Sequence, residues 1–368
     1  YYGVYGYQDS DRLIRNGGDF CLVNYGIEAF RKACPGYKIL VTFFSPSGYE
    51  IRKNYPGADY IFYLPPDTPR NVRRFMAIVR PKIAVFVKYE FWVNYLLAMK
   101  RAGTKLYLIS SIFRDGQIFF RPYGGLFRSA LRAFRHIFVQ NDSSRNLLKS
   151  IGIEQVSVAG DTRFDRVYEI AQQAKRLPEI ERFAADAPVF IAGSTWPPDE
   201  ELLVGLIERY PDVKFIVAPH EIDPARIEKF CERISRPALR YTQLTPQSDL
   251  AAAGVLFVDT IGILSSVYRY GRWGYIGGGF GAGIHNTLEA ATFGLPLAFG
   301  PRYGKFREAR DLVTLRGAAS IASAEELERW FAGLHDDPDA TGRSGTICKE
   351  YVLQHKGATA RIMDEICR

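Results

Sequence analysis

The chain has 368 residues, 47% hydrophobic and 24% charged, a composition that excludes a disordered protein and a length that predicts about two domains. Its five cysteines, an odd number without a Cys-X-X-Cys pair, exclude a disulfide scaffold and a zinc knuckle, and without a run of 18 apolar residues no membrane-spanning helix is predicted. The net charge is +8, and residues 1–165 hold 24 Lys and Arg against 13 Asp and Glu, so the first half carries +11 and the rest −3.

The positive charge of the first half predicts an anionic partner, which could be a nucleic acid, a membrane surface or a phosphorylated substrate. The alternative is that this charge only keeps the surface soluble. Within it, short apolar segments alternate with helix-like segments such as Thr68–Val79 and Asp142–Ile151. Continuous apolar strands spaced by helices predict a parallel sheet covered on both faces. The predicted strands are Lys38–Phe44, Tyr60–Tyr63, Ile83–Lys88, Lys105–Ser110, His136–Gln140 and Gln155–Ala159.

The second half repeats this alternation and predicts a second α/β sheet of similar size. A polar helix and a linker, residues 166–187, separate domain 1–165 from domain 188–352, and a terminal helix falls within residues 353–368. The predicted strands are Val189–Ala192, Lys214–Ala218, Val255–Asp259, Trp273–Ile276 and Leu295–Phe299.

A glycine-rich segment follows the strand Trp273–Ile276 and runs from Gly277-Gly278-Gly279 to Asn286 and Glu289. Glycines let backbone N–H groups approach an anion, and a helix N-terminus adds the positive end of its dipole. Glu289 is either a capping-box residue or an acceptor for ribose hydroxyls. The spacing does not fit the dinucleotide fingerprint, so a tight strand-to-helix turn is the alternative.

Two further motifs stand at the carboxyl ends of predicted strands, where open α/β sheets bind ligands. Gly193-Ser194-Thr195-Trp196 offers two hydroxyls to a phosphate, with capping of the next helix as the alternative. Pro219-His220 ends another strand, which makes His220 a candidate ligand. In the first half, Glu90 ends a strand in the same way and is either a helix-cap charge or a substrate ligand.

Residues 121–135 form an amphipathic segment that either lies on anionic lipid headgroups or covers the sheet with a wet basic face. One face holds Leu126, Phe127, Leu131 and Phe134, and another holds Arg128, Arg132 and Arg135. The acid pairs Asp9/Asp11 and Asp337/Asp339 do not follow predicted strands, so no metal site is predicted.

Together these motifs resemble the bacterial 3-deoxy-D-manno-octulosonic acid (Kdo) transferases of lipopolysaccharide biosynthesis, in the form found in Bacteroidetes-type bacteria. The likeness runs in order from about Gly26 to the C-terminus. The matching stretches are Thr42–Glu50, Lys88-Tyr-Glu-Phe-Trp92, Gly160-Asp-Thr-Arg-Phe-Asp165, Gly193-Ser-Thr-Trp196, Ala218-Pro-His220, Gly277–Glu289 and Phe299-Gly-Pro301.

The resemblance implies an α/β GT-B glycosyltransferase, with two Rossmann-like domains facing a central cleft and the helix within residues 353–368 returning to the first domain. It implies CMP-Kdo as the donor, a lipid A precursor as the acceptor, and no cofactor, metal or nucleic acid. The implied location is the cytoplasmic face of the inner membrane, either peripheral or through an N-terminal anchor absent from this sequence. The basic first domain would then face the anionic membrane surface.

The resemblance also assigns site residues. Donor-binding residues are Gly193, Ser194, Thr195, Pro219, His220, Gly277, Gly278, Gly279, Asn286 and Glu289. Acceptor-binding residues are Ser45, Ser47, Arg52, Lys88, Glu90 and Arg163. A carboxylate base would remove a proton from the acceptor hydroxyl as it attacks the anomeric carbon of Kdo, and CMP would leave as an anion stabilised by backbone N–H groups.

The expected base is Asp19, because Gly18-Asp19-Phe20 matches the family's Gly-Glu-Phe motif, with Glu90 and Glu50 in reserve. Aspartate withdraws the carboxylate by about 1.5 Å, and misplacement on this scale lowers rates on the order of a hundredfold. The aspartate in place of the family's glutamate has three explanations: a slower enzyme, a homologue that binds a nucleotide sugar without efficient turnover, or an altered sequence start. A nucleic-acid-binding module is a further alternative, although the basic half shows no recognition helix or aromatic RNA-binding motif.

Overall fold

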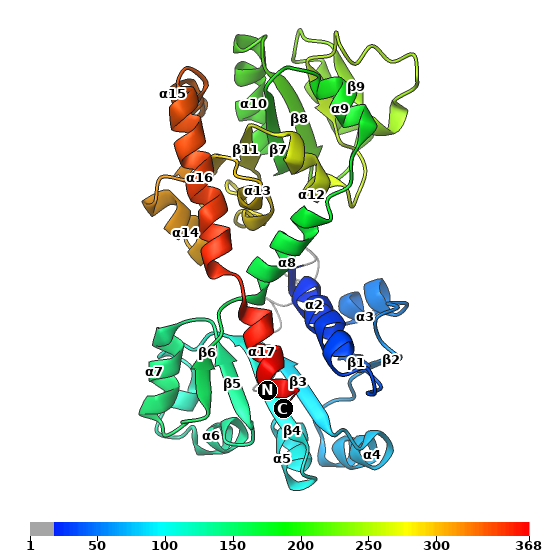
Figure 1. Ribbon diagram of the computed structural model, residues 1–368, viewed down its shortest axis with the longest axis vertical. Helices are drawn as coiled ribbons and strands as arrows, with labels where there is room; N and C mark the ends of the chain where they lie inside the picture. Colours follow the sequence, from blue (N-terminus) through cyan, green and yellow to red (C-terminus); the bar gives the residue numbers. More distant parts are fainter. Residues whose placement is uncertain (1–17, 368) are drawn as a thin grey trace. The chain divides into compact units, whose positions relative to one another are not determined.

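The computed structural model describes residues 18–367, with the side chains of residues 18–25, Ser47 and Ile51 outside the description (Figure 1). The described chain divides into two compact units. Unit 1 contains the residues up to Arg166 and those from His355 onward, and unit 2 contains Val167–Gln354. The first boundary falls inside helix α8 (Thr162–Gln172), and α9 (Pro178–Ala184) follows it. The stretch predicted as a helix and a linker therefore holds two helices.

Unit 1 has six parallel strands, and all six lie within two residues of the predicted ranges. They form two sheets rather than one: β1 pairs with β2, and the other four are ordered β3-β4-β5-β6. The residues of β2 are largely exposed, so the smaller sheet stands outside the main core of this unit. The strands are β1 (Leu40–Phe43), β2 (Tyr60–Tyr63), β3 (Ile83–Val87), β4 (Lys105–Ser111), β5 (His136–Val139) and β6 (Val156–Val158).

Three helices of unit 1, α3, α4 and α7, begin at a residue whose side chain caps them. Thr68 caps α4 by accepting a hydrogen bond from the backbone of Asn71, with Pro69 in the first turn. Asn141 caps α7 in the same way through Ser144 N. The helices are α2 (Gly18–Ala33), α3 (Pro46–Arg52), α4 (Pro69–Val79), α5 (Val93–Arg101), η1 (Ile118–Phe120), α6 (Gly125–Leu131), α7 (Asp142–Ser150) and α17 (Ala358–Ile366).

The C-terminal helix α17 belongs to unit 1, where Ile362 and Ile366 pack against residues of β4 and β5 (Figure 1). The buried carboxylate of Asp165 fixes its start. Its Oδ2 accepts hydrogen bonds from the backbone N (2.8 Å) and the hydroxyl (3.0 Å) of Thr359. Its Oδ1 accepts from the N–H of Gly357, which has a positive φ. One side chain thus satisfies donors that a helix N-terminus leaves open.

The ends of α2 and α17 bring two thiols together. Cys34 Sγ and Cys367 Sγ lie 2.8 Å apart although 333 positions separate them in the chain. Both are free cysteines in the structure. Wide spacing in the sequence therefore did not indicate separation in space.

Unit 2 has one seven-stranded parallel sheet of order β13-β12-β11-β7-β8-β10-β9. The five strands predicted for this half are confirmed, each within three residues. The two that were not predicted, β9 and β13, are three-residue strands at the two edges of the sheet. The strands are β7 (Val189–Thr195), β8 (Lys214–Pro219), β9 (Ala238–Arg240), β10 (Val255–Phe257), β11 (Trp273–Ile276), β12 (Leu297–Phe299) and β13 (Ala318–Ser320).

Helices flank this sheet and bury its apolar side chains. Phe190, Phe215 and Trp273 of the central strands pack with Phe331 of α15 in one fully buried cluster. The further helices of unit 2 are α10 (Pro197–Arg209), α11 (Pro224–Cys231), η2 (Tyr241–Gln243), α12 (Leu264–Val267), η3 (Tyr268–Tyr270), α13 (Leu288–Thr292), α14 (Arg307–Thr314), α15 (Ala324–His335) and α16 (Pro338–His355).

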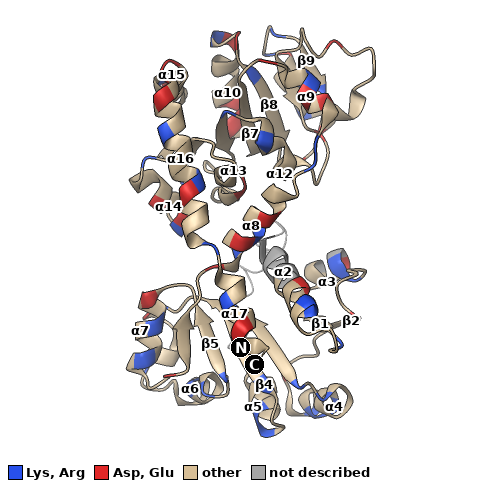
Figure 2. Ribbon diagram, viewed as in Figure 1, with Lys and Arg blue, Asp and Glu red and all other residues tan. Residues whose placement is uncertain are grey.

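The amphipathic segment 121–135 is arranged differently from its predicted pattern. Leu131 and Phe134 are buried in the core of unit 1, whereas Tyr123 and Leu126 are exposed. The guanidinium of Arg128 donates to the carbonyls of residues 119, 121 and 122, so it closes the preceding loop. The exposed basic side chains here are Arg121, Arg132 and Arg135. Figure 2 shows further Lys and Arg positions on α4 and α7.

Candidate functional site

The donor-binding motifs predicted from sequence meet at one edge of the unit 2 sheet. Strands β11, β7 and β8 are neighbours, and all three run parallel. Gly193 is in register with Ile276 on one side and Ala218 on the other. The segments that follow these three strands therefore emerge side by side at the carboxyl edge, where open α/β sheets bind ligands.

Glycine is required where two of these segments cross. The N–H of Gly277 donates to the carbonyl of Gly193 (2.9 Å). A Cβ added at Gly277 would lie 2.2 Å from the Ser194 carbonyl oxygen, and one added at Gly193 would lie 1.9 Å from the hydroxyl of Tyr268. Ser194 itself adopts a positive φ of 55° at a bulge in β7. The two backbones thus approach more closely than any side chain permits.

The Asp199 carboxylate joins the two loops. This fully buried side chain accepts hydrogen bonds from Trp196 N (2.9 Å), Gly278 N (2.9 Å) and the Tyr275 hydroxyl (2.8 Å). Burial raises the pKa of Asp199, while the three donors act in the opposite direction. Asp199 was not predicted as a site residue. Its position three residues after Trp196 is the capping-box spacing, which was the available signal.

Thr195 does not have the role predicted for it. Its side chain is fully buried and its hydroxyl donates to Glu200 Oε1 (2.9 Å), so that proton is not available to a ligand. Nη2 of Arg226 lies 3.4 Å from the same oxygen. Burial raises the pKa of Glu200, and Arg226 opposes that shift. Thr195 therefore supports the loop rather than contacting the donor, which corrects the prediction.

The triple glycine also departs from the expected anion cradle. Gly277, Gly278 and Gly279 are all buried. The N–H groups of the first two are occupied by Gly193 and Asp199, and a Cβ on Gly279 would lie 2.5 Å from Gly300 Cα. These glycines serve close packing of the loops. The accessible part of the segment begins at Gly281 and Ala282, which are exposed.

Three aromatic rings lie together beside this segment. The indole of Trp196 donates from Nε1 to His285 Nε2 (2.9 Å), and the two rings are nearly coplanar at 10°. His220, which follows Pro219, stacks on both, with ring centroids 4.9 Å from Trp196 and 4.2 Å from His285. Its backbone N–H donates to the Thr195 carbonyl (2.9 Å). Of these three rings, only that of His220 was predicted as part of the site.

Glu289 stands at the far end of the segment. Asn286 Nδ2 donates to Glu289 Oε1 (2.9 Å), and Asn286 Oδ1 accepts from Leu288 N. Burial raises the pKa of Glu289, and the charge of Glu289 in turn adds to the raised pKa of buried Tyr268. Because Tyr268 also abuts Gly193, Glu289 lies near the end of β7. Nothing in the sequence indicated Tyr268.

The predicted acceptor-binding residues occupy two places in unit 1. Lys88 follows β3 with a positive φ of 58°, and Arg163 follows β6. Both act on buried Asp161: Arg163 Nε lies 2.8 Å from its Oδ2. Burial alone would raise the pKa of Asp161, but Arg163 and Lys88 hold it below the ordinary value. The carboxyl edge of the four-stranded sheet is therefore a cationic cluster around one buried acid.

The other predicted acceptor residues lie near the two-stranded sheet or beside β3. Ser45 caps α3 through Gly48 N, and Arg52 is half-buried at the end of α3. Glu90 accepts a hydrogen bond from the Trp92 indole. The ring centroids of Phe44 and Trp92 lie 4.7 Å apart, so the segment after β1 contacts the segment after β3. The Ser47 side chain lies outside the description.

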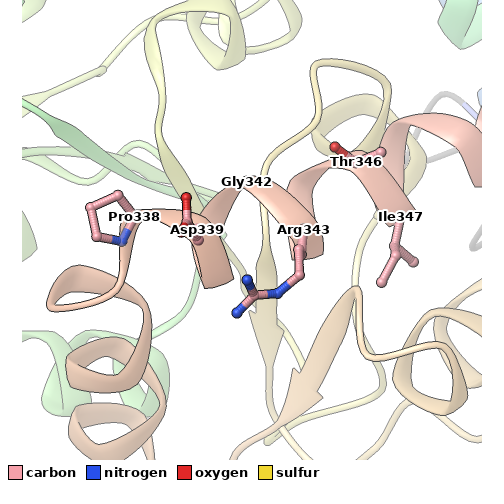
Figure 3. A pocket seen from close by; sticks show the side chains of 6 residues that line it. All are labelled: Pro338, Asp339, Gly342, Arg343, Thr346 and Ile347. Atoms are coloured by element: carbon pink, nitrogen blue, oxygen red, sulfur yellow. The ribbon is translucent and has the colours of Figure 1, made fainter.

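The predicted base and the two acid pairs lie apart from these residues in the sequence. Asp19 lies in the first turn of α2, and its side chain is outside the description. Asp9 and Asp11 fall before the described residues. Asp337 caps the start of α16 through Ala340 N. A surface pocket beside this helix contains none of the predicted site residues and is lined by residues of α16 alone. The lining residues are Pro338, Asp339, Gly342, Arg343, Thr346 and Ile347 (Figure 3).

Known proteins resemble this chain over most of its length. Residues 18–166 match the family model described as 3-Deoxy-D-manno-octulosonic-acid transferase (kdotransferase). The 3-deoxy-D-manno-octulosonic acid transferase of Haemophilus influenzae is 24% identical over 351 residues, which cover 90% of this chain and 80% of that protein. The corresponding protein of Aquifex aeolicus is 26% identical over 289 residues, covering 77% of this chain and 74% of that protein.

Among solved structures, UDP-GlcNAc 2-epimerase from Neisseria meningitidis bound to UDP-GlcNAc is similar with a TM-score of 0.63. It is 15% identical, and the match covers 94% of this chain and 95% of that one. At this identity the likeness concerns the fold alone. The predicted α/β fold of the GT-B type, with two Rossmann-like units, is confirmed.

We expect Asp199→Asn to destabilise unit 2, because an amide would place N–H groups against the donors that the carboxylate accepts. An unsatisfied buried group costs about 1–3 kcal/mol of unfolding free energy. Denaturation followed by tryptophan fluorescence measures it, since Trp196, Trp273 and Trp330 all lie in unit 2. Exposed Glu201, which lies on the same helix as Asp199 and pairs with Arg233, is the control. Glu201→Gln should change stability by less than about 1 kcal/mol, and an equal loss in both variants would contradict the role of Asp199.

Proposed function

Because the chain is a homologue of the bacterial Kdo transferases, as its motifs predicted, we propose that it transfers Kdo from CMP-Kdo to a hydroxyl of a lipid A precursor. The similarity to these enzymes over most of the chain carries the proposal. The cluster at the carboxyl edge of the unit 2 sheet supplies a nucleotide site whose polar groups come from three neighbouring strand ends.

The donor would contact the accessible groups of this cluster. Ser194, His220 and Asn286 reach the surface, and the carboxylate of Glu289 accepts hydrogen bonds from the ribose hydroxyls. The buried glycines and Asp199 hold these groups in place without touching the ligand. Kdo transfer to the acceptor hydroxyl breaks the bond between the anomeric carbon and the phosphate oxygen, and CMP leaves with both electrons of that bond.

The acceptor would bind unit 1. Lys88 and Arg163 supply positive charge for the phosphates of a lipid A precursor, partly balanced by Asp161. The carboxylate of Asp19 is the proposed base that takes the proton of the attacking hydroxyl. No metal ion is assigned a step, since hydrogen-bond donors can stabilise the departing phosphate.

The acceptor would place the protein at the cytoplasmic face of the inner membrane. No helix of the described chain is long and apolar enough to cross a bilayer. The exposed Arg, Tyr and Leu side chains of residues 121–135, here called the arginine surface, would suit anionic headgroups; they are Arg121, Tyr123, Leu126, Arg132 and Arg135.

The direct test is Kdo transfer from enzymatically generated CMP-Kdo to a lipid A precursor, followed by mass spectrometry. We expect a product heavier by one or more Kdo residues, formed equally well with and without EDTA. Loss of activity with EDTA and recovery with magnesium would contradict metal independence. No transfer together with tight CMP binding would favour a homologue without efficient turnover.

We expect Glu289→Ala to weaken CMP binding about ten- to a hundredfold, because a carboxylate hydrogen bond contributes about 1.5–3 kcal/mol. Calorimetry measures the dissociation constant. The matched ligand is 2′,3′-dideoxy-CMP, which lacks the ribose hydroxyls. The wild-type protein should prefer CMP, and Glu289→Ala should lose that preference. An unchanged preference would refute the ribose contact.

We expect Asp19→Asn to abolish transfer and leave CMP binding intact, because the amide keeps the shape of the side chain and removes its basicity. Asp19→Glu should raise kcat if the missing methylene is the defect. Asp115→Asn, the same change on an exposed turn of unit 1, is the control. Full turnover by Asp19→Asn would place the base elsewhere, with Glu90→Gln and Glu50→Gln as the next variants.

We expect unit 1 to bring the protein to anionic vesicles, since each basic residue near such a surface contributes up to about 1 kcal/mol. Co-sedimentation should fall with salt and with Arg121, Arg132 and Arg135 changed to Glu. The charge-matched control changes exposed Arg310, Arg329 and Lys349 of unit 2 to Glu. Equal losses in both triple variants would show a net-charge effect and contradict the arginine surface.

A further inference from the structure

The contact between Trp196 and His285 determines where a proton sits. An indole nitrogen can only donate a hydrogen bond, so the imidazole nitrogen opposite it, His285 Nε2 at 2.9 Å, must accept. A neutral imidazole that accepts at Nε2 carries its hydrogen on Nδ1. A protonated ring would set two N–H groups against each other. The pair is therefore compatible with one tautomer of His285 only.

The surroundings of His285 favour the same neutral state. Burial, the larger cause, and neighbouring His220 together lower the pKa of His285 to about 4. Burial also lowers the pKa of His220, with Arg226 in the same direction and Glu221 opposing. Two stacked imidazoles at 4.2 Å are not both charged near neutral pH. The ring of His285 thus offers a hydrogen bond without a positive charge.

The backbone on both sides of this contact is held by one group. Asp199 binds the N–H of Trp196 and the N–H of Gly278. Gly278 has a φ of 92°, and a Cβ there would lie 2.9 Å from His285 Cδ2, so the glycine makes room for the ring. Among the described residues, Nδ1 of His285 has no hydrogen-bond partner. It is the open donor of a preorganised group.

We propose that Trp196 is a positioning residue that fixes His285 as the Nδ1–H tautomer, so that this N–H donates to a phosphate oxygen of the nucleotide. The proposal rests on the proposed donor site and adds a residue and a protonation state to it. A neutral donor strengthens its hydrogen bond as the phosphate gains charge during departure, yet it does not hold the CMP product as a cation would.

The tautomer is measured without any ligand. In protein labelled with ¹⁵N-histidine, the two-bond correlations of His285 should show a protonated Nδ1 and an unprotonated Nε2 at pH 7, unchanged down to about pH 5. Trp196→Phe keeps a ring in place and removes the donor, so it should produce a mixture of tautomers. Trp330→Phe, the same change elsewhere in unit 2, should leave the spectrum unchanged. A protonated Nε2 in the wild-type protein overturns the proposal.

Binding measurements then separate phosphate contact from general support. Trp196→Phe should weaken CMP about tenfold, the size expected for one hydrogen bond, and leave cytidine binding unchanged. Equal losses for CMP and cytidine would indicate a structural role and overturn the proposal. Melting temperatures of all variants report whether the fold is kept.

A second pair of variants tests the same point if Trp196→Phe unfolds. The amide of His285→Asn falls near Nδ1, and that of His285→Gln falls near Nε2. His285→Asn should therefore bind CMP more tightly than His285→Gln, and the reverse order overturns the proposal. A wild-type protein that does not bind CMP contradicts the proposed donor and the phosphate contact, while the tautomer measurement still decides the role of Trp196.

Discussion

The proposed donor site depends on one buried carboxylate. Asp199 receives N–H groups from two loops that follow different strands, and a hydroxyl from β11 itself. An acid in this position is unfavourable unless all its lone pairs are used, since an unpaired buried charge is far more costly than a neutral group. The loops must therefore assume one relative position for the carboxylate to be satisfied. The positions of Trp196, His285 and the glycines all follow from it.

This arrangement changes how the glycine-rich segment should be understood. Glycine next to a strand end predicts an anion cradle, and that prediction assumes that the N–H groups face outward. Here those of Gly277 and Gly278 face inward, toward Gly193 and Asp199. The glycines are needed because backbone packs on backbone. The accessible groups are instead side chains at the rim, where polar residues and aromatic rings gather.

Much of the fold could be predicted from sequence, since eleven of the thirteen strands of the described chain were expected, most of them from short apolar segments between helix-like ones. Edge strands β9 and β13 read Ala-Leu-Arg and Ala-Ala-Ser, so they lack the large apolar side chains that mark the equally short β10, Val-Leu-Phe. At the site, residues directly after strands were found because position alone marks them. Tyr268 and Asp199 were not, because their roles arise from contacts between segments up to 79 positions apart; the capping-box spacing of Asp199 marks a helix start and not these contacts.

The contacts that hold α2 determine how far the shorter side chain of Asp19 can be compensated by a movement of the helix. Arg31, near the end of α2, binds the Gly57 carbonyl (3.0 Å) and Asp59 (2.9 Å), and α17 packs along α2. Asp19 lies twelve residues before this anchor, about 18 Å along the helix axis at 1.5 Å per residue. A tilt of roughly 5° about the anchor would move the first turn by about 1.5 Å, the length that aspartate lacks. A small rigid movement of α2 would therefore bring the Asp19 carboxylate to the place that a glutamate carboxylate would reach. For this reason Asp19→Glu discriminates between a proposed base that is displaced and one that is missing.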